Sequence, residues 1–431
     1  MSLDAFEMDF LTRLIAIQSV GGAEENGLPY GAKPFEALKF FLDTANAEGF
    51  RTGIINNRSG FAEIGPSDSD KLLGIVCHLD VVPEGSGWDT DPFDLTLKED
   101  GRLYGRGIID DKGPAACALF AMRRLLKSGY EFKSRVRLIL GTDEERTCSC
   151  IEDYAKNGEI PTFAITPDAE FPVIYAEKGI LNIKVYTNEP SDVSAFAGQA
   201  ANMVPAESRA VINGREYLGK GVPSHASRPE LGVNAVFDMV NKIGEDIKAS
   251  PLLTYIRDEL ASKEASDYTG CSIEDESGKI TANPSVLRID ETGGSIVIDI
   301  RYPVTTKAED ILEYMSGIAS TYGLKAEITN HMAPLFKEKD TPEIAMLTSV
   351  WSKHMGSYDG FKPEYKDLYT EPLAIGGGTY ARHMPNTIAF GLQAPWQKDQ
   401  CHQANESLSV TDLETDIAVL EDAIKGLTEL F

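Results

Sequence analysis

The residues LLGIVCHLD at positions 72–80 form a short apolar run that ends in His78 and Asp80. Side chains of these two types commonly coordinate metal ions or hydrogen-bond the residues that do. A near-continuous apolar run of this length is typical of a strand in a parallel sheet that is covered on both faces. Three further runs of the same kind lie at residues 136–140, 163–166 and 387–390. We therefore predict an α/β domain with a mostly parallel sheet and helices on both faces.

Helical patterns lie between and after these runs. Residues 113–127 place Pro114 at a helix start and basic residues in the last turns, as backbone geometry and the helix dipole favour. The final helix is predicted to open with Thr411 and Glu414, which have capping-box spacing.

A second kind of pattern begins near Gly179 and ends near Lys337. Residues 295–300, SIVIDI, alternate between apolar and other side chains, and two helical patterns lie at residues 231–248 and 306–322. An antiparallel sheet with helices on one face accounts for both features. We predict an inserted α+β, ferredoxin-like lid domain at residues 179–336, with residues 1–178 and 337–431 forming a discontinuous catalytic domain.

Each predicted parallel strand leads into side chains that can bind a metal. His78 and Asp80 follow the first run, Asp143, Glu144 and Glu145 the second, Asp168 the third and, after a loop, His402 the fourth. Asp110 and Asp111 follow a glycine-containing turn before the helix that starts at Gly113. In open α/β sheets ligands bind outside the carboxyl ends of the strands, so we expect these residues to converge.

The donor set points to metal chemistry rather than to a disulfide or thiolate framework. Two histidines with several carboxylates suit Zn²⁺, with Mn²⁺ or Co²⁺ as alternatives, and the six cysteines form no CxxC pair. Two divalent ions fit this set, since one bridging carboxylate lets five residues serve both.

The charge balance restricts the partners. The 431 residues include 41 basic and 67 acidic side chains, a net charge of −26, which disfavours nucleic acid and anionic lipid surfaces. The N-terminal residues show no basic region followed by an apolar core, and no apolar stretch is long enough for a membrane span. We expect a cytoplasmic protein whose partner is small or cationic, with no nucleic acid and no membrane.

These motifs together resemble the dinuclear zinc peptidases that include aminoacylases, succinyl-diaminopimelate desuccinylase and carnosinases, and most closely the PepV-type dipeptidases. The matching stretches are HLD at residues 78–80, GRGIIDDKG at 105–113, GTDEE at 141–145, PDA at 167–169, FPVIYAEKG at 171–179 and HQANE at 402–406.

The resemblance implies a role for each matching residue of the first domain. His78 and Asp168 would hold one ion, Glu145 and His402 the other, and Asp110 would bridge both. Asp80 would accept a hydrogen bond from the second nitrogen of His78, and Glu144 would act as the general base. The resemblance also implies a cis peptide bond between Asp110 and Asp111, whereas we interpret the Asp111 and Asp143 side chains as structural or supporting.

The resemblance extends to the second domain. His225 in HAS would hydrogen-bond the tetrahedral oxyanion, Asn202 would lie near the same place, and Arg301 would clamp a substrate carboxylate together with the glycine-rich loop around Gly377. An alternative interpretation is that Arg301 forms an ordinary salt bridge at the end of a strand. Only residues 203–224 separate Asn202 from His225, a shorter interval than in PepV-type relatives, so both a monomer and a homodimer that exchanges His225 remain open.

The function implied is hydrolysis of the peptide bond of unblocked dipeptides by a water that two metal ions and Glu144 activate. One alternative is an N-acyl-amino-acid deacylase or desuccinylase with the same chemistry. An alternative of another class is a non-catalytic metal-binding relative.

Overall fold

The computed structural model describes residues 3–431, and the chain divides into two compact units. Unit 1 comprises Met1–Tyr175, Lys337–Leu373 and Thr379–Phe431, and unit 2 comprises Ala176–Phe336 and Ala374–Gly378. Residues 374–378, which we had assigned to the first domain, lie in unit 2, where the backbone N–H of Lys178 donates a hydrogen bond to the carbonyl of Ile375 at 2.9 Å.

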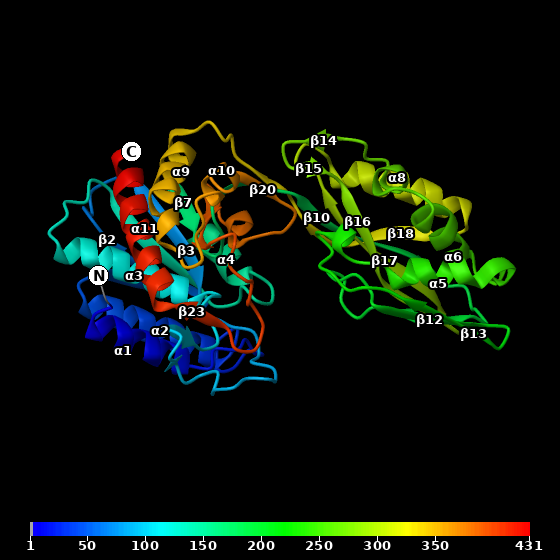
Figure 1. Cartoon of the computed structure of the whole chain (residues 1–431), viewed down its shortest axis with the longest axis horizontal. Helices are drawn as coiled ribbons and strands as arrows, with labels where there is room; N and C mark the ends of the chain where they lie inside the picture. The colour runs from blue at the N-terminus through cyan, green and yellow to red at the C-terminus, as the bar shows by residue number, and fades with distance from the viewer. Residues whose placement is uncertain (1–2) are drawn as a thin grey trace. The chain divides into compact units, whose positions relative to one another are not determined.

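The larger sheet has parallel strands at its centre and antiparallel strands toward its edges. Figure 1 labels β2, β3 and β7 of this sheet among the helices of unit 1. Its order is β1 (Arg51–Ile55), β2 (Ser59–Ile64), β6 (Arg135–Gly141), β3 (Leu72–His78), β7 (Phe163–Thr166), β21 (Thr387–Phe390), β9 (Val173–Glu177) and β19 (Leu335–Phe336), and β20 (Leu373–Ile375) also pairs with β9. Strands β6, β3, β7 and β21 pair in parallel. These are the four strands predicted from the apolar runs.

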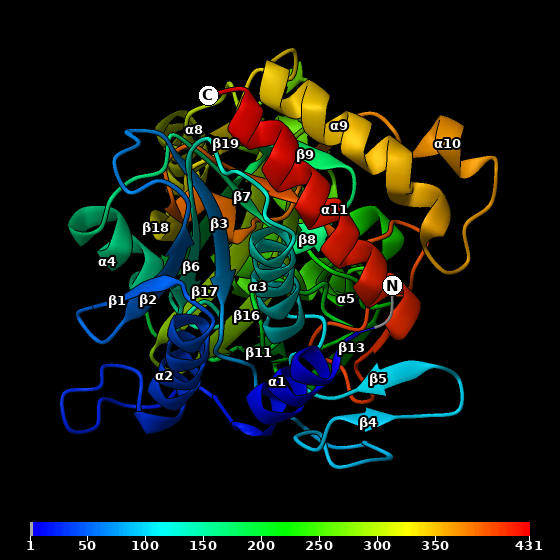
Figure 2. The same cartoon turned by 90° about the vertical axis from the view of Figure 1, so that its left-hand side faces the viewer.

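Helices cover both faces of this sheet, as predicted. On one face Phe10 of α1 (Ala5–Ala16) packs edge-on against Phe41 of α2 (Ala32–Ala47) and Phe120 of α3 (Lys112–Lys127). Figure 2 shows α3 and α11 (Val410–Glu429) lying over the strands, and α9 (Pro342–His354) packs on α11. On the other face, Tyr154 of α4 (Ser149–Asn157) joins a buried cluster with Val76 of β3.

Unit 2 is an antiparallel sheet with helices on one face. Its strand order is β13 (Arg215–Lys220), β12 (Glu207–Ile212), β11 (Ser194–Ala197), β16 (Thr281–Asp290), β17 (Gly293–Tyr302), β10 (Gly179–Thr187) and β18 (Lys325–Met332). One core cluster joins Met239 of α5 (Ala235–Ile243) and Met315 of α8 (Ala308–Thr321) to Ile183 and Ile298 of the sheet. The predicted α+β architecture of this part is confirmed.

Short elements complete the described chain. They are β4 (Thr96–Leu97), β5 (Arg102–Tyr104), β8 (Ala169–Glu170), β22 (Leu392–Gln393), β23 (Ser407–Ser409), β14 (Glu274–Asp275), β15 (Gly278–Lys279), α6 (Pro251–Tyr255), α7 (Ala265–Thr269) and α10 (Tyr365–Leu368).

Two helix boundaries differ from the prediction. Helix α5 begins after Asn234, whose side chain accepts from the N–H of Val236, and ends at Gly244, so it is shorter than the predicted 231–248. Helix α11 has Ser409 as its N-cap, whose hydroxyl accepts from the N–H of Asp412 at 2.9 Å. The predicted capping box at Thr411 is therefore wrong, because the helix has already begun there.

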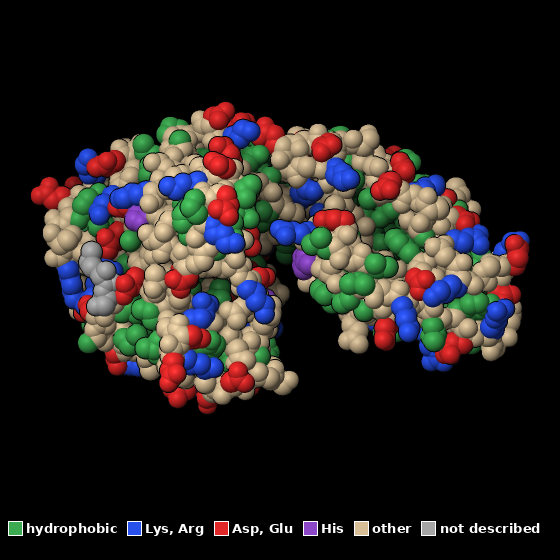
Figure 3. Space-filling model, viewed as in Figure 1, with side chains coloured by type: hydrophobic (Ala, Val, Ile, Leu, Met, Phe, Trp, Pro, Cys, Tyr) green, Lys and Arg blue, Asp and Glu red, His purple; other side chains and the backbone are tan. Residues whose placement is uncertain are grey.

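The surface and the cysteines agree with the expectations from composition. Figure 3 shows acidic and basic side chains interspersed over the face it draws. None of the helices in residues 3–431 combines the length and apolar character needed to span a bilayer. All six cysteines are free thiols, and Cys77, Cys117, Cys148, Cys150 and Cys271 are buried.

We predict that Ser409→Ala lowers the free energy of unfolding by about 1 kcal/mol, because it removes the N-cap of α11. Thr411→Ala is the matched control and should leave the free energy of unfolding nearly unchanged, since Thr411 is exposed and caps nothing. Urea unfolding of the three proteins measures both values. A larger loss for Thr411→Ala than for Ser409→Ala would contradict the assignment of the cap.

Candidate metal centre

The parallel strands of unit 1 bring the predicted metal-binding side chains together. His78 ends β3, and the other members lie in the loop before α3, in the loops that follow β6 and β7, and in the loop between β22 and β23. These members are Asp110, Glu144, Glu145, Asp168 and His402. The convergence follows from the topology, because the carboxyl ends of parallel strands share one edge of the sheet.

Asp110 lies between the two histidines. Its Oδ1 is 3.0 Å from Nε2 of His78, and its Oδ2 is 3.0 Å from Nε2 of His402. His78 Nε2 also lies 3.6 Å from Oδ2 of Asp168, and His402 Nε2 lies 3.0 Å from Oε2 of Glu145. Each histidine thus has a second carboxylate beside it and shares Asp110 with the other. His78, Asp110 and Glu145 also lie close enough to hold one ion, so the division of the ligands between two ions stays a prediction.

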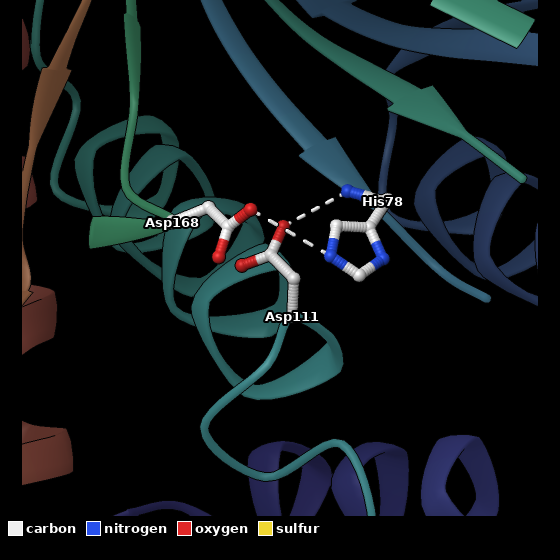
Figure 4. Close-up of side chains that lie close together, drawn as sticks. All are labelled: His78, Asp111 and Asp168. Carbon is white, nitrogen blue, oxygen red and sulfur yellow. Dashed lines mark hydrogen bonds and ion pairs between the residues drawn. The ribbon is translucent and has the colours of Figure 1, made fainter. Parts of the chain in front are cut away.

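Asp111 lies next to the same histidine. Figure 4 shows its carboxylate near both Asp168 and His78, and these three residues form one of the groups whose atoms are close enough to hold an ion. Its Oδ2, however, already accepts a hydrogen bond from the backbone N–H of His78 at 2.8 Å. The peptide bond between Asp110 and Asp111 is cis, which confirms that geometric prediction.

Asp80 supports the centre in a different way from the predicted one. The Nδ1 of His78 lies 2.9 Å from the backbone carbonyl oxygen of Asp80, whereas the Asp80 carboxylate is 3.6 Å away. A carbonyl accepts only, so Nδ1 carries a proton, and the other ring nitrogen, Nε2, faces the Asp110 carboxylate at 3.0 Å. The carboxylate of Asp80 instead accepts from the backbone N–H groups of Glu144 and Glu145, at 3.1 and 3.2 Å.

Burial and crowding change the proton affinity of these side chains. Burial raises the pKa of Glu144 to about 8, and the charges of Asp168 and Asp110 add to this rise. Burial likewise raises the pKa of Asp168 to about 7, with a further contribution from Asp110. The Asp110 and Glu145 carboxylates accept hydrogen bonds from His402, and this raises the pKa of His402 to about 10.

The donor set fits divalent cations. Ligands of a single tetrahedral zinc ion lie about 2 Å from the metal and hence roughly 3 to 3.5 Å from one another, which matches the spacings around each histidine. Among residues 3–431, Oε1 of Glu145 is one of the buried oxygens that have no hydrogen-bond partner. A buried oxygen of this kind is costly unless a proton donor or a cation satisfies it.

The predicted residues of the second domain gather within unit 2. His225 is exposed, and its Nδ1 lies 2.7 Å from the hydroxyl of Ser227 and accepts from the backbone N–H of Ser227 at 3.2 Å. Because Nδ1 accepts, the neutral ring carries its proton on Nε2, which is then a donor. The carbonyl of Asn202 accepts from the N–H of Ala226 at 2.8 Å, so Asn202 adjoins this motif.

Arg301 is engaged within unit 2. Its Nε and Nη2 donate to the two carboxylate oxygens of Asp299 at 2.6 and 3.0 Å, and its Nη1 donates to the carbonyl of Gly376 at 3.2 Å. This is the strand-end salt bridge that we gave as the alternative, and Gly377 is the next residue of the loop it contacts. The role of Arg301 as a clamp for a substrate carboxylate stays a prediction.

Three contributions were missed from the sequence. Ser227 orients His225, and the only signal was its place two residues beyond the histidine in HAS. Tyr380 packs edge-on against His78, with ring centroids 6.0 Å apart. A cavity of about 590 Å³ in unit 1 is lined by Ile109, Asp168, Glu170, Tyr365 and Trp396, among others, and thus adjoins the metal-binding loops.

Comparison with known proteins gives a consistent assignment. The sequence profile of peptidase family M20/M25/M40 matches residues 74–426. A Bacillus subtilis protein named "Putative dipeptidase YtjP" is 32% identical over 448 residues, covering 94% of this chain and 92% of that protein. A Staphylococcus saprophyticus protein named "Putative dipeptidase SSP1012" is 31% identical and covers 95% and 94%.

The fold is also that of solved peptidases. The Saccharomyces cerevisiae dipeptidase Dug1p superposes with a TM-score of 0.61 at 16% sequence identity, covering 98% of this chain and 96% of that chain. At this identity the likeness concerns the fold.

We predict that Asp110→Asn weakens the binding of both metal ions by at least about 10-fold, because it removes the charge of the carboxylate that lies 3.0 Å from both histidines. Asp111→Asn should keep both ions, since the new side chain still offers an oxygen to the N–H of His78. Titration of the metal-free proteins with Zn²⁺ gives the number of ions and their affinities. Loss of an ion in Asp111→Asn alone would identify Asp111, rather than Asp110, as the ligand.

Proposed function

The chain belongs to peptidase family M20/M25/M40 and is a metal-dependent peptidase, and from this premise we propose that it cleaves the peptide bond of unblocked dipeptides. The observation that carries the proposal is the position of Asp110 between His78 and His402, each with a second carboxylate beside it. We propose that His78 and Asp168 hold one ion and His402 and Glu145 the other, with Asp110 bridging. Zn²⁺ is the ion that this donor set favours.

The residues of unit 1 supply proton transfer. When bound, the two ions supply the charge that acidifies a water and polarises the carbonyl of the substrate. Glu144 takes the proton of the water and later gives it to the leaving amine, as a general base and then a general acid. Asp80 holds the backbone of Glu144, and this contact fixes where the loop presents the carboxylate.

The residues of unit 2 supply contacts to the substrate in this proposal. His225 donates a hydrogen bond from Nε2 to the tetrahedral oxyanion, and the contact of its Nδ1 with Ser227 supports that tautomer. Asn202, Arg301 and Gly377 bind the remaining polar groups of the dipeptide, with Arg301 acting through the Gly376 loop that it contacts.

The proposed dipeptide substrate rests on the names of relatives matched over more than nine-tenths of their length, which are called "Putative dipeptidase". The free thiols favour a reducing compartment, and we propose the cytoplasm. Hydrolysis of N-acyl amino acids would use the same chemistry. These substrates differ from dipeptides in carrying an acyl group without the free amine.

We predict that the zinc-loaded protein hydrolyses unblocked dipeptides and leaves N-acetyl and N-succinyl amino acids intact. The assay measures release of free amino acids from both substrate sets, and a chelator-treated sample is the control. Turnover of the acylated substrates alone would reassign the enzyme as a deacylase. Absence of turnover with any substrate would favour the non-catalytic alternative.

We predict that Glu144→Gln lowers kcat by about 10²- to 10⁴-fold, the range for loss of a general base, while both metal ions remain bound. Glu152→Gln is the matched control, because Glu152 lies on the following helix with its side chain 48% exposed. Steady-state kinetics with metal quantification tests this. An unchanged kcat in Glu144→Gln would show that another group transfers the proton.

A further inference from the structure

Glu406 is a buried carboxylate that the proposed reaction does not use. Its side chain is fully buried, and it forms an ion pair with Arg106, which is 1% exposed, at 2.6 Å. Because it lies four residues beyond His402, it belongs to the loop that carries a proposed ligand.

The Glu406 carboxylate accepts hydrogen bonds from the backbone of the loop that carries Asp110. The N–H of Ile109 donates to Oε1 at 2.8 Å, and the N–H of Gly107 lies 3.1 Å from both oxygens. The N–H of Asp110 itself donates to Oε1 at 3.4 Å. One side chain therefore joins the loop of Asp110 to the loop of His402.

Both loops adopt backbone conformations that need support. His402 and Asn405 have φ angles of 63° and 62°, in the left-handed region that residues with a side chain rarely adopt, and Gly107 has a φ of 89°. Neither proposed ligand in these loops lies in a strand, so side-chain contacts such as those of Glu406 replace the ladder hydrogen bonds.

Arg106 fixes the direction of the Glu406 carboxylate. Its Nη1 donates to Oε2, its Nη2 donates to the carbonyl of Glu84 at 3.3 Å, and its guanidinium lies 5.3 Å from the ring centre of Trp88. Arg106 is thus held on two sides. Because it binds Oε2 of Glu406, Oε1 of Glu406 accepts hydrogen bonds from the backbone N–H groups of Ile109 and Asp110.

We propose that Glu406 is a positioning residue that sets the distance between Asp110 and His402, and thereby the affinity for the ion shared by His402 and Glu145. The inference rests on the proposed two-ion function. In addition, the affinities for the two ions should depend on Glu406 to different degrees. The ion held by His78 and Asp168 depends less on Glu406, because these ligands end or follow β3 and β7, which pair directly.

Two substitutions test this role. Glu406→Asp keeps the charge that Arg106 needs but shortens the side chain, and Glu406→Gln keeps the length but removes the charge. The matched control is Glu63→Asp, because Glu63 forms a buried ion pair with Arg137, at 2.7 Å, between β2 and β6. Within residues 3–431, the ion pairs of Glu63 are with Arg51, Arg135 and Arg137, which lie in β1 and β6 and not in the metal-binding loops, so this control reports on stability alone.

The measurement is titration of the metal-free proteins with Zn²⁺, combined with thermal unfolding of the same metal-free samples. In both Glu406 variants we expect the affinity for one ion to fall by about 10- to 100-fold, as for residues that orient metal ligands, with a much smaller change for the other ion. Glu63→Asp should bind both ions as the unaltered protein does, even where its unfolding temperature falls equally.

Unchanged affinity for both ions in the two Glu406 variants would overturn the proposal. It would also fall if both ions weakened to the same degree. The titration needs no substrate, so it separates this inference from the proposed activity. If the Glu406 variants weaken one ion more than the other but the protein hydrolyses no dipeptide, the proposed activity is refuted and the role of Glu406 is supported.

Discussion

The structure of unit 1 depends on the crowding of Asp110, Glu144, Glu145 and Asp168 around two histidines at one edge of the parallel sheet. Like charges this close in a buried place repel one another, and the raised pKa values of Glu144 and Asp168 express that repulsion together with the cost of burial. A bound divalent cation would reduce both the repulsion between the carboxylates and the cost of burying their charges. The surrounding features are consistent with our proposal that two metal ions complete this centre.

The supports act mainly through the backbone. The carbonyl of Asp80 orients His78, its carboxylate holds the N–H groups of Glu144 and Glu145, and Glu406 holds the segment before Asp110. The carboxylates of Asp80 and Glu406 thus replace regular hydrogen bonds that these loops lack. This explains how side chains from loops far apart in the sequence keep spacings close to 3 Å.

The parallel strands could be predicted because continuous apolar runs leave few alternatives, and the convergence of His78, Glu145, Asp168 and His402 follows from that topology. Finer features depended on loop geometry, which residue types do not fix. The sequence could not show that the carbonyl of Asp80, rather than its carboxylate, meets His78. The ion pair of Arg301 with Asp299 was foreseeable as an alternative, since residues two apart share one face of a strand.

The ends of helices α5 and α11 also differed from the prediction. The capping box at Thr411 matched a pattern, but Ser409, the last residue of β23, offers a hydroxyl two residues earlier. The prediction of α5 ran too far because apolar spacing continues past Gly244, although the chain leaves the helix there. Where several residues satisfy one local rule, tertiary contacts decide between them.

The central claim is that Asp110 bridges two ions, and anomalous X-ray scattering from crystals of the zinc-loaded protein tests it most directly. The account predicts two anomalous peaks, one between His78 and Asp168 and one between His402 and Glu145, with Asp110 contacting both. A single peak, or two peaks bridged by Asp111 instead of Asp110, would contradict it.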